Sequence, residues 1–122
     1  MQGLWLTQGR DGVIRIAPCG LLFCGWIAGL DLGPGEAMPH DVQGRPQCGL
    51  QLISGLRQIG PNEWQGSITN PRDGKVYDAR LSMDEGKLRL RGYVLVPLFG
   101  ATQIWTRYPG GVTPNCRMTA PG

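Results

Sequence analysis

Apolar and polar residues alternate with a period of two along much of this chain, and that pattern is typical of half-buried β-strands. The alternation is clearest from Lys75 to Met83, where Tyr77, Ala79 and Leu81 would share one face of a strand. Segments rich in Gly, Pro, Asn and Asp separate the alternating runs, as hairpin turns require. The sequence therefore predicts a series of β-hairpins with little helix.

The predicted strands follow one another along the chain. They are eight in number and cover Gly3–Thr7, Val13–Ala17, Leu21–Leu30, Leu50–Ile59, Glu63–Thr69, Lys75–Met83, Lys87–Val96 and Thr102–Tyr108. Pro18-Cys19-Gly20 is expected to end the second strand, because proline cannot donate a ladder hydrogen bond. Leu50–Ile59 also fits one side of a short helix, although we favour a strand that bends at Gly55.

The stretch from Leu88 to Arg107 predicts the hairpin that closes the sheet against the first strand. A meander of this kind hides its edges best by closing on itself. We therefore predict an all-β fold, a small eight-stranded antiparallel up-and-down barrel. Residues 31–47 form its one long loop, and residues 109–122 form a Pro/Gly-rich C-terminal tail beyond a single barrel domain of residues 1–108.

The 122 residues carry a net charge of +3, and basic residues are scattered among acidic ones rather than gathered in a block. Nucleic-acid binders more often show a dense basic face with stacking aromatics, so no nucleic-acid partner is expected. No apolar run reaches the roughly 18 residues that a membrane helix needs, so no membrane span is expected. Arg80, Arg89 and Arg91 are interpreted as part of a solvated barrel exterior.

Four cysteines in a chain of this size indicate two disulfides and an oxidising compartment. Cys19 and Cys24 flank a predicted hairpin and would cross-link it, whereas Cys48 with Cys116 would pin the tail to the barrel. A pairing of Cys48 with Cys19 or Cys24 is the alternative. The Cys19-x4-Cys24 spacing lacks a zinc knuckle and the chain has a single histidine, so neither a metal nor a cofactor is expected.

His40 beside Asp41 is the only candidate for acid–base chemistry, and it lies in the long loop without a nearby nucleophile. We expect His40 to be exposed to solvent, and we expect no enzyme. Aromatic residues are the candidates to line a ligand pocket, with packing as the alternative for each. They are Trp26, Trp64, Tyr77, Tyr93, Phe99 and Trp105.

Several short motifs follow one another along the chain, each occurring once. They are Gly3–Thr7, Val13–Cys19, Leu22–Gly25, Asp41, Arg45-Pro46 with Cys48–Leu50, Asn70-Pro71 with Asp73–Lys75 and Tyr77, Arg91–Tyr93, Pro97–Gly100, and Trp105–Arg107. Together they resemble a family of small exported bacterial proteins, domain of unknown function 2147. The family commonly carries an Asn shortly after the loop Asp, whereas Val42 and Gln43 follow Asp41 here.

The resemblance implies a lipocalin-like barrel that is periplasmic or secreted, with no established activity. We expect Met1 to be an engineered start on a mature chain from which the export signal has been removed. The wider lipocalin pattern, which this chain resembles, covers a Gly-x-Trp on the first strand with an Arg from the last strand. Trp5 and Arg107 occupy those places. A guanidinium over an indole gains roughly 0.5–2 kcal/mol, so this pair is expected to seal one end of the barrel.

Two functions remain open. The first is a binding module that holds a small hydrophobic ligand in the barrel, with residues 31–47 near the opening. The alternative is a filled barrel that recruits a protein partner or supports the envelope, and an enzyme of unknown type comes third. Inward convergence of Leu88 and Leu90 with the tryptophans would indicate a full interior, whereas Gly66 and Gly92 would leave space.

Overall fold

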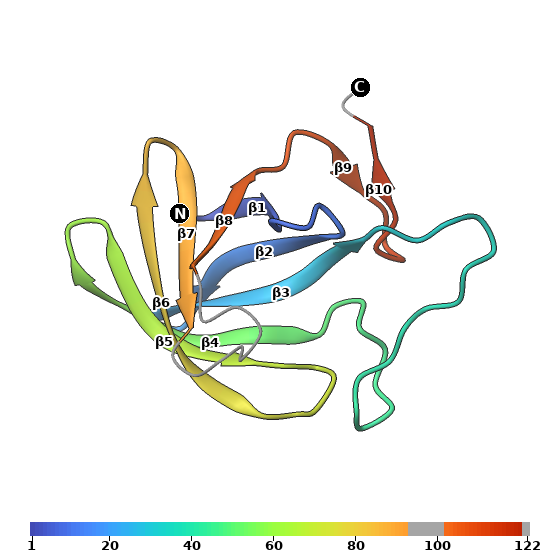
Figure 1. Ribbon diagram of the computed structural model, residues 1–122, viewed down its shortest axis with the longest axis horizontal. Helices are drawn as coiled ribbons and strands as arrows, with labels where there is room; N and C mark the ends of the chain where they lie inside the picture. Colours follow the sequence, from blue (N-terminus) through green and yellow to red (C-terminus); the bar gives the residue numbers. More distant parts are fainter. Residues whose placement is uncertain (93–101, 121–122) are drawn as a thin grey trace.

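The computed structural model describes residues 1–92 and 102–120 of the chain. These residues form a closed antiparallel barrel of eight strands without a helix, which confirms the predicted fold class (Figure 1). The barrel strands are β1 Gly3–Leu6, β2 Gly12–Cys19, β3 Leu22–Leu30, β4 Gln51–Gly60, β5 Glu63–Thr69, β6 Val76–Asp84, β7 Lys87–Gly92 and β8 Thr102–Arg107. In the described part of the chain, no helix has the length and apolar character to cross a membrane.

Each barrel strand pairs with the next one along the chain, and β8 returns to pair with β1. The closing ladder is short, with Trp5 opposite Arg107 and Leu6 opposite Thr106. Because successive strands are antiparallel, the turns after β2, β4 and β6 lie at one end of the barrel. The turns after β1 and β5 and the long loop after β3 lie at the other end.

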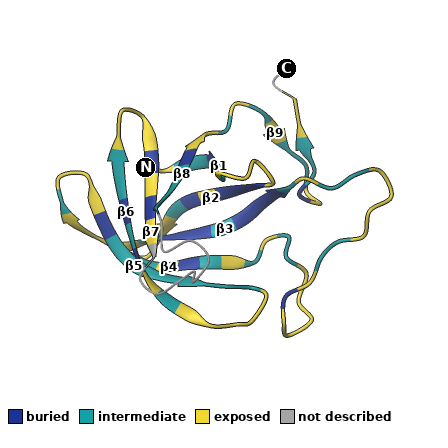
Figure 2. Ribbon diagram, viewed as in Figure 1, coloured by how far each residue is buried: buried dark blue, intermediate teal, exposed yellow. Residues whose placement is uncertain are grey.

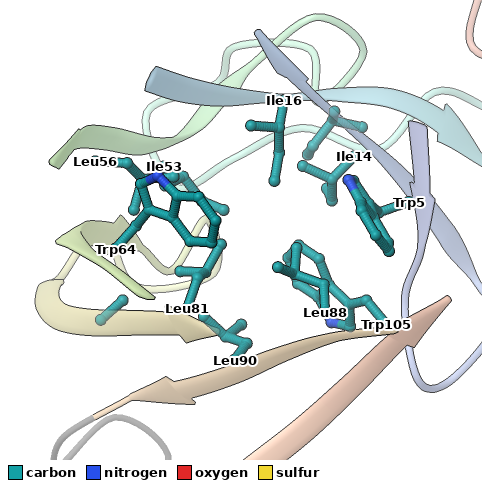
Figure 3. Packing of buried hydrophobic residues seen from close by; sticks show 12 residues of the cluster. Trp5, Ile14, Ile16, Ile53, Leu56, Trp64, Leu81, Leu88, Leu90 and Trp105 are labelled. Atoms are coloured by element: carbon teal, nitrogen blue, oxygen red, sulfur yellow. The ribbon is translucent and has the colours of Figure 1, made fainter. Parts of the chain in front are cut away.

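The core lies inside the barrel and takes side chains from each of the eight barrel strands (Figures 2 and 3). Its buried members are Trp5, Ile14, Ile16, Ile27, Ile53, Leu56, Trp64, Ala79, Leu81, Leu88, Leu90 and Trp105. The strand period explains this arrangement, since Leu88 and Leu90 point inward while Arg89 and Arg91 remain exposed on β7.

One predicted strand end is wrong. Pro18 does not end β2, which continues to Cys19. The reason is that β1 pairs with β2 only as far as Ile16, so the last residues of β2 have a partner strand on one side alone. Proline is tolerated at such an edge because a missing N–H there breaks no ladder bond.

The fourth strand is a strand and not a helix, so the helical alternative is wrong. Gly55 has φ +63°, and the register with β5 shifts between Ser54 and Arg57, which are the marks of a β-bulge. The loop before β4 also runs three residues further than predicted, since residues 31–50 separate β3 from β4.

The C-terminal segment forms a small hairpin rather than a plain tail. Its strands, β9 Gly111–Val112 and β10 Met118–Thr119, pair with each other and lie beside the end of β3 (Figure 1). Gly29 makes this packing possible, because a Cβ there would lie 2.9 Å from Val112 Cγ1 and 3.1 Å from Met118 Cγ. The Leu30 N–H also donates to the carbonyl oxygen of Cys116 at 2.7 Å.

Candidate functional site

A small eight-stranded barrel can either be filled by its own side chains or hold one small ligand. Here Leu88 and Leu90 lie in the same core as Trp5, Trp64 and Trp105 (Figure 3). All five side chains are at most 9% exposed. The described interior therefore consists of packed aromatic and aliphatic side chains.

Neighbouring atoms also occupy the space beside Gly66 and Gly25, where a missing side chain could leave room in the barrel wall. A Cβ on Gly66 would lie 2.6 Å from the carbonyl oxygen of Ser54 and 2.9 Å from the backbone of Gly55, because the β4 bulge presses against it. A Cβ on Gly25 would lie 3.1 Å from Ile53. The glycines thus permit close packing of strands and do not open a pocket. Gly92 lies opposite Ala79 in the β6–β7 ladder, and the residues that follow Gly92 lie outside the described part of the chain.

The aromatic pocket candidates occupy different places. Trp64 and Trp105 belong to the core. Trp26 pairs with the exposed Arg15 and therefore faces the outer side of the wall, where it is half-buried. Tyr77 is half-buried on β6. None of these four residues lines either of the two hollows on the outer wall of the described residues. The other two candidates, Tyr93 and Phe99, lie outside the residues that the structure describes.

Trp5 and Arg107 meet at the seam between β1 and β8. The guanidinium carbon of Arg107 lies 4.1 Å from the centroid of the Trp5 ring. Trp5 Nε1–H donates to the Met1 carbonyl at 2.7 Å, and Arg107 Nη1 donates to the Gln2 carbonyl at 2.6 Å. Gly3 leaves room for the arginine, because a Cβ there would lie 2.6 Å from Arg107 Nη1. The contacts tie the amino-terminal residues to the last barrel strand.

Both predicted disulfides are present, and the alternative pairing of Cys48 is wrong. Cys19 bonds to Cys24 across the two-residue turn between β2 and β3, and Cys48 bonds to Cys116. No cysteine is left free. The first bond cross-links the β2–β3 hairpin, whereas the second joins the long loop to the C-terminal hairpin. Two disulfides are consistent with a location outside the cytoplasm.

Asp41 organises the long loop. Its carboxylate is buried, and Oδ1 accepts the backbone N–H groups of Gln43 at 2.9 Å and Arg45 at 2.8 Å. Oδ2 accepts Arg45 Nε and Nη2, each at 2.8 Å. Burial favours the protonated acid, but the hydrogen bonds and the charge of Arg45 outweigh it and lower the pKa of Asp41. His40 beside it is exposed, as predicted. The geometry assigns Asp41 to holding the loop rather than to proton transfer.

The long loop is fastened to other elements near its start and in its middle. Arg117 Nη1 donates to the carbonyls of Leu32 at 3.1 Å and Gly33 at 3.0 Å. The Val42 N–H donates to the carbonyl of Pro71 in the turn between β5 and β6 at 2.9 Å. The long loop is therefore held both by the C-terminal hairpin and by the turn between β5 and β6.

Two hollows stand out among the described residues, and both open on the outer side of the wall. One, of about 340 Å³, lies beneath the C-terminal hairpin and includes Arg15, Ala28, Val112 and Pro114 in its lining. The other, of about 210 Å³, is lined by Glu63, Arg80, Ser82, Arg89 and Arg91. Across the described part of the chain, no three His, Cys, Asp or Glu side chains gather as a metal site.

The sequence did not predict the hollow that the arginines line. The sequence predicts only that Arg80, Arg89 and Arg91 belong to a solvated barrel exterior. The one feature of the sequence that points to this hollow is that all three arginines occupy outward positions on neighbouring strands. The pairing of β6 with β7 then brings them together. Charge spacing along the chain does not reveal such pairing, because the register of the two strands determines it.

The fold defines the chain as a disulfide-stapled, eight-stranded antiparallel barrel protein. The family follows from comparison with known proteins. The model of DUF2147, described as "uncharacterized protein conserved in bacteria", matches residues 3–107, and the chain belongs to this family. The match ends with β8, so the C-terminal hairpin and Cys116 lie beyond it. No curated protein and no solved structure gives a significant match to the chain.

Proposed function

We propose that this chain is a non-enzymatic interaction module of the bacterial envelope, whose outer wall recruits a partner while its interior serves stability. The observation that carries the proposal is the packed core, to which every barrel strand contributes. A barrel filled in this way has little room for a small apolar ligand. That ligand-binding role, our first expectation from the sequence, therefore loses support to the filled-barrel alternative.

The disulfides support a periplasmic or secreted location for the module. Disulfides persist in oxidising compartments and are rare in the cytoplasm. The chain uses all four of its cysteines in this way. Its family is bacterial, so the periplasm or the exterior of the cell is the compartment that we propose.

The tip of the β2–β3 hairpin is the part of the wall best suited to contact a protein. Leu21 is fully exposed at 102%, and Leu22 is 37% exposed. The Cys19–Cys24 disulfide closes the same turn. A rigid exposed apolar tip loses little conformational freedom on binding, and this preorganisation favours affinity.

Native mass spectrometry of the protein purified from its own periplasm tests the filled interior. The expected mass is that of the disulfide-bonded polypeptide alone. A reproducible additional mass of a lipid-like molecule would contradict the proposal.

A photoreactive amino acid at Leu21, introduced in intact cells, tests the role of the tip. We expect a discrete cross-linked protein species from this position. The matched position is Arg72, which is exposed in the turn between β5 and β6. Equal labelling from both positions, or none from Leu21, would count against a contact at the tip.

A further inference from the structure

Three arginines gather on the outer face of β6 and β7. Arg80 lies directly opposite Arg91 in the β6–β7 ladder, and Ser82 lies opposite Arg89. Together with Glu63 of β5, these residues line the hollow of about 210 Å³. The strand period places Arg89 and Arg91 on the same side of β7, so three guanidinium groups converge on one small concave surface.

The charges of this hollow are not balanced within the described residues. Arg89 Nη2 lies 3.6 Å from Asp84 Oδ2, and this is the one ion pair that any of the three arginines forms there. Glu63 lines the hollow without pairing with any of them. Like charges placed directly opposite in a sheet are destabilising, so the Arg80–Arg91 pair disfavours the empty site.

Arg80 also carries a buried polar atom without a partner. Its Nε is inaccessible to solvent and has no hydrogen-bond partner among the described residues. Buried N–H groups nearly always donate a hydrogen bond to an acceptor, so the unpaired Nε–H of Arg80 indicates that an acceptor can bind next to it. An acceptor entering the hollow would meet the Arg80 guanidinium and the neighbouring guanidinium groups at once.

The chemistry of the lining selects the ligand. Guanidinium groups bind oxyanions through paired N–H donors, and the Ser82 hydroxyl adds a further donor. A planar carboxylate offers two oxygens in one plane. A phosphate group offers oxygens in several directions and up to two negative charges, which suits donors that arrive from two strands. We propose that this hollow binds the phosphate group of a small phosphate ester or of a lipid headgroup.

This inference is independent of the proposed function, because phosphate binding requires neither an empty interior nor a protein partner. Phosphorus NMR of inorganic phosphate, titrated with the intact oxidised protein, is the direct test. We expect saturable line broadening from one site per chain. Both Arg80→Gln and Arg91→Gln should weaken this binding by roughly tenfold or more, since each removes charge-assisted hydrogen bonds.

Arg72→Gln is the matched control, because it removes the same charge from an exposed turn outside the hollow. It should leave the affinity within about twofold, as a distant surface charge contributes little. Arg91 is exposed, so its substitution is expected to leave the fold intact, as circular dichroism would show. Absence of saturable binding to the wild-type protein, or equal weakening by Arg72→Gln, would overturn the proposal.

Two further probes separate the sources of the phosphate. Glycerol phosphate represents a soluble ester, and phosphatidylcholine vesicles containing phosphatidic acid represent a headgroup. Binding to either probe that Arg80→Gln weakens and Arg72→Gln spares supports the site, and the tighter probe identifies the source. Binding to both that is insensitive to Arg80→Gln and Arg91→Gln would overturn it.

Discussion

At the seam between β1 and β8, Trp5 is completely buried beneath the guanidinium of Arg107. The indole fills the core from the first strand, and its N–H satisfies the Met1 carbonyl. One residue thus contributes buried apolar area, a hydrogen bond and a cation–π contact at the place where the barrel closes.

Trp5→Ala should therefore lower the free energy of unfolding by roughly 3–5 kcal/mol, as large-to-small substitutions of buried tryptophans do. Denaturant unfolding of the oxidised protein measures the change. The matched variant is Trp26→Ala, which removes a half-buried indole from the outer wall and should cost clearly less. Equal losses for the two variants would contradict the assigned role of Trp5.

The ionised carboxylate of Asp41 stabilises the conformation of the long loop. Its pKa in the folded protein is lowered, because hydrogen bonds from Arg45 and Gln43 outweigh the effect of burial. The unfolded value is about 3.9. A depressed folded pKa means that the carboxylate stabilises the fold fully above that pH, and that this stabilisation is lost as pH falls through the lower folded value.

Titration of the protein by NMR should show the backbone amides of Gln43 and Arg45 shifting together, with a midpoint below about pH 3.9. In Asp41→Asn the same amides should not titrate in this range. A midpoint at or above the ordinary value would mean that the hydrogen bonds do not favour the carboxylate.

At the scale of elements, the two disulfides have different tasks. Cys19–Cys24 spans a sequence separation of 5, and Cys48–Cys116 spans 68. In the chain-entropy account a disulfide stabilises more when it closes a longer loop, which gives roughly 2 kcal/mol for the first bond and roughly 4 kcal/mol for the second. The longer bond also ties the C-terminal hairpin to the long loop.

Replacing Cys48 and Cys116 together by serine should therefore cost more stability than replacing Cys19 and Cys24. It should also release the C-terminal hairpin first, so that the backbone amides of Leu30 and of position 116 lose hydrogen-exchange protection while the amides of β6 and β7 keep theirs. Equal losses in the two double variants, or unchanged protection of the hairpin, would contradict this division of roles.

The elements themselves were predictable where the chain is buried on one side only. Lys75–Met83 alternates because one face of β6 meets the core and the other meets solvent. β9 and β10 were not predictable, because strands of two residues have no period to recognise. Their position depends on a distant disulfide and on the absence of a side chain at Gly29, neither of which is visible in the local sequence.

At the scale of the molecule, the sequence predicted the closed barrel but could not decide between a hollow and a filled one. A glycine at position 66 predicts space in the wall, whereas the bulge of β4 places the backbone of Ser54 and Gly55 in that space. The arginine hollow likewise depends on strand register, which pairs Arg80 with Arg91. Packing and cross-strand proximity are properties of the folded chain and are only weakly encoded in local patterns.

Side chains fill the interior of the barrel, and binding of benzene measured by NMR is a direct test of that filling. Leu56 is completely buried in the core, so Leu56→Ala should cost roughly 2–5 kcal/mol and leave a cavity lined by apolar groups. Such cavities bind benzene. We predict that benzene shifts the resonances of core residues in Leu56→Ala and leaves those of the wild-type protein unchanged. Saturable shifts at Ile14, Ile53 and Leu81 in the wild-type protein would show that the barrel already holds an empty cavity, and would contradict the account.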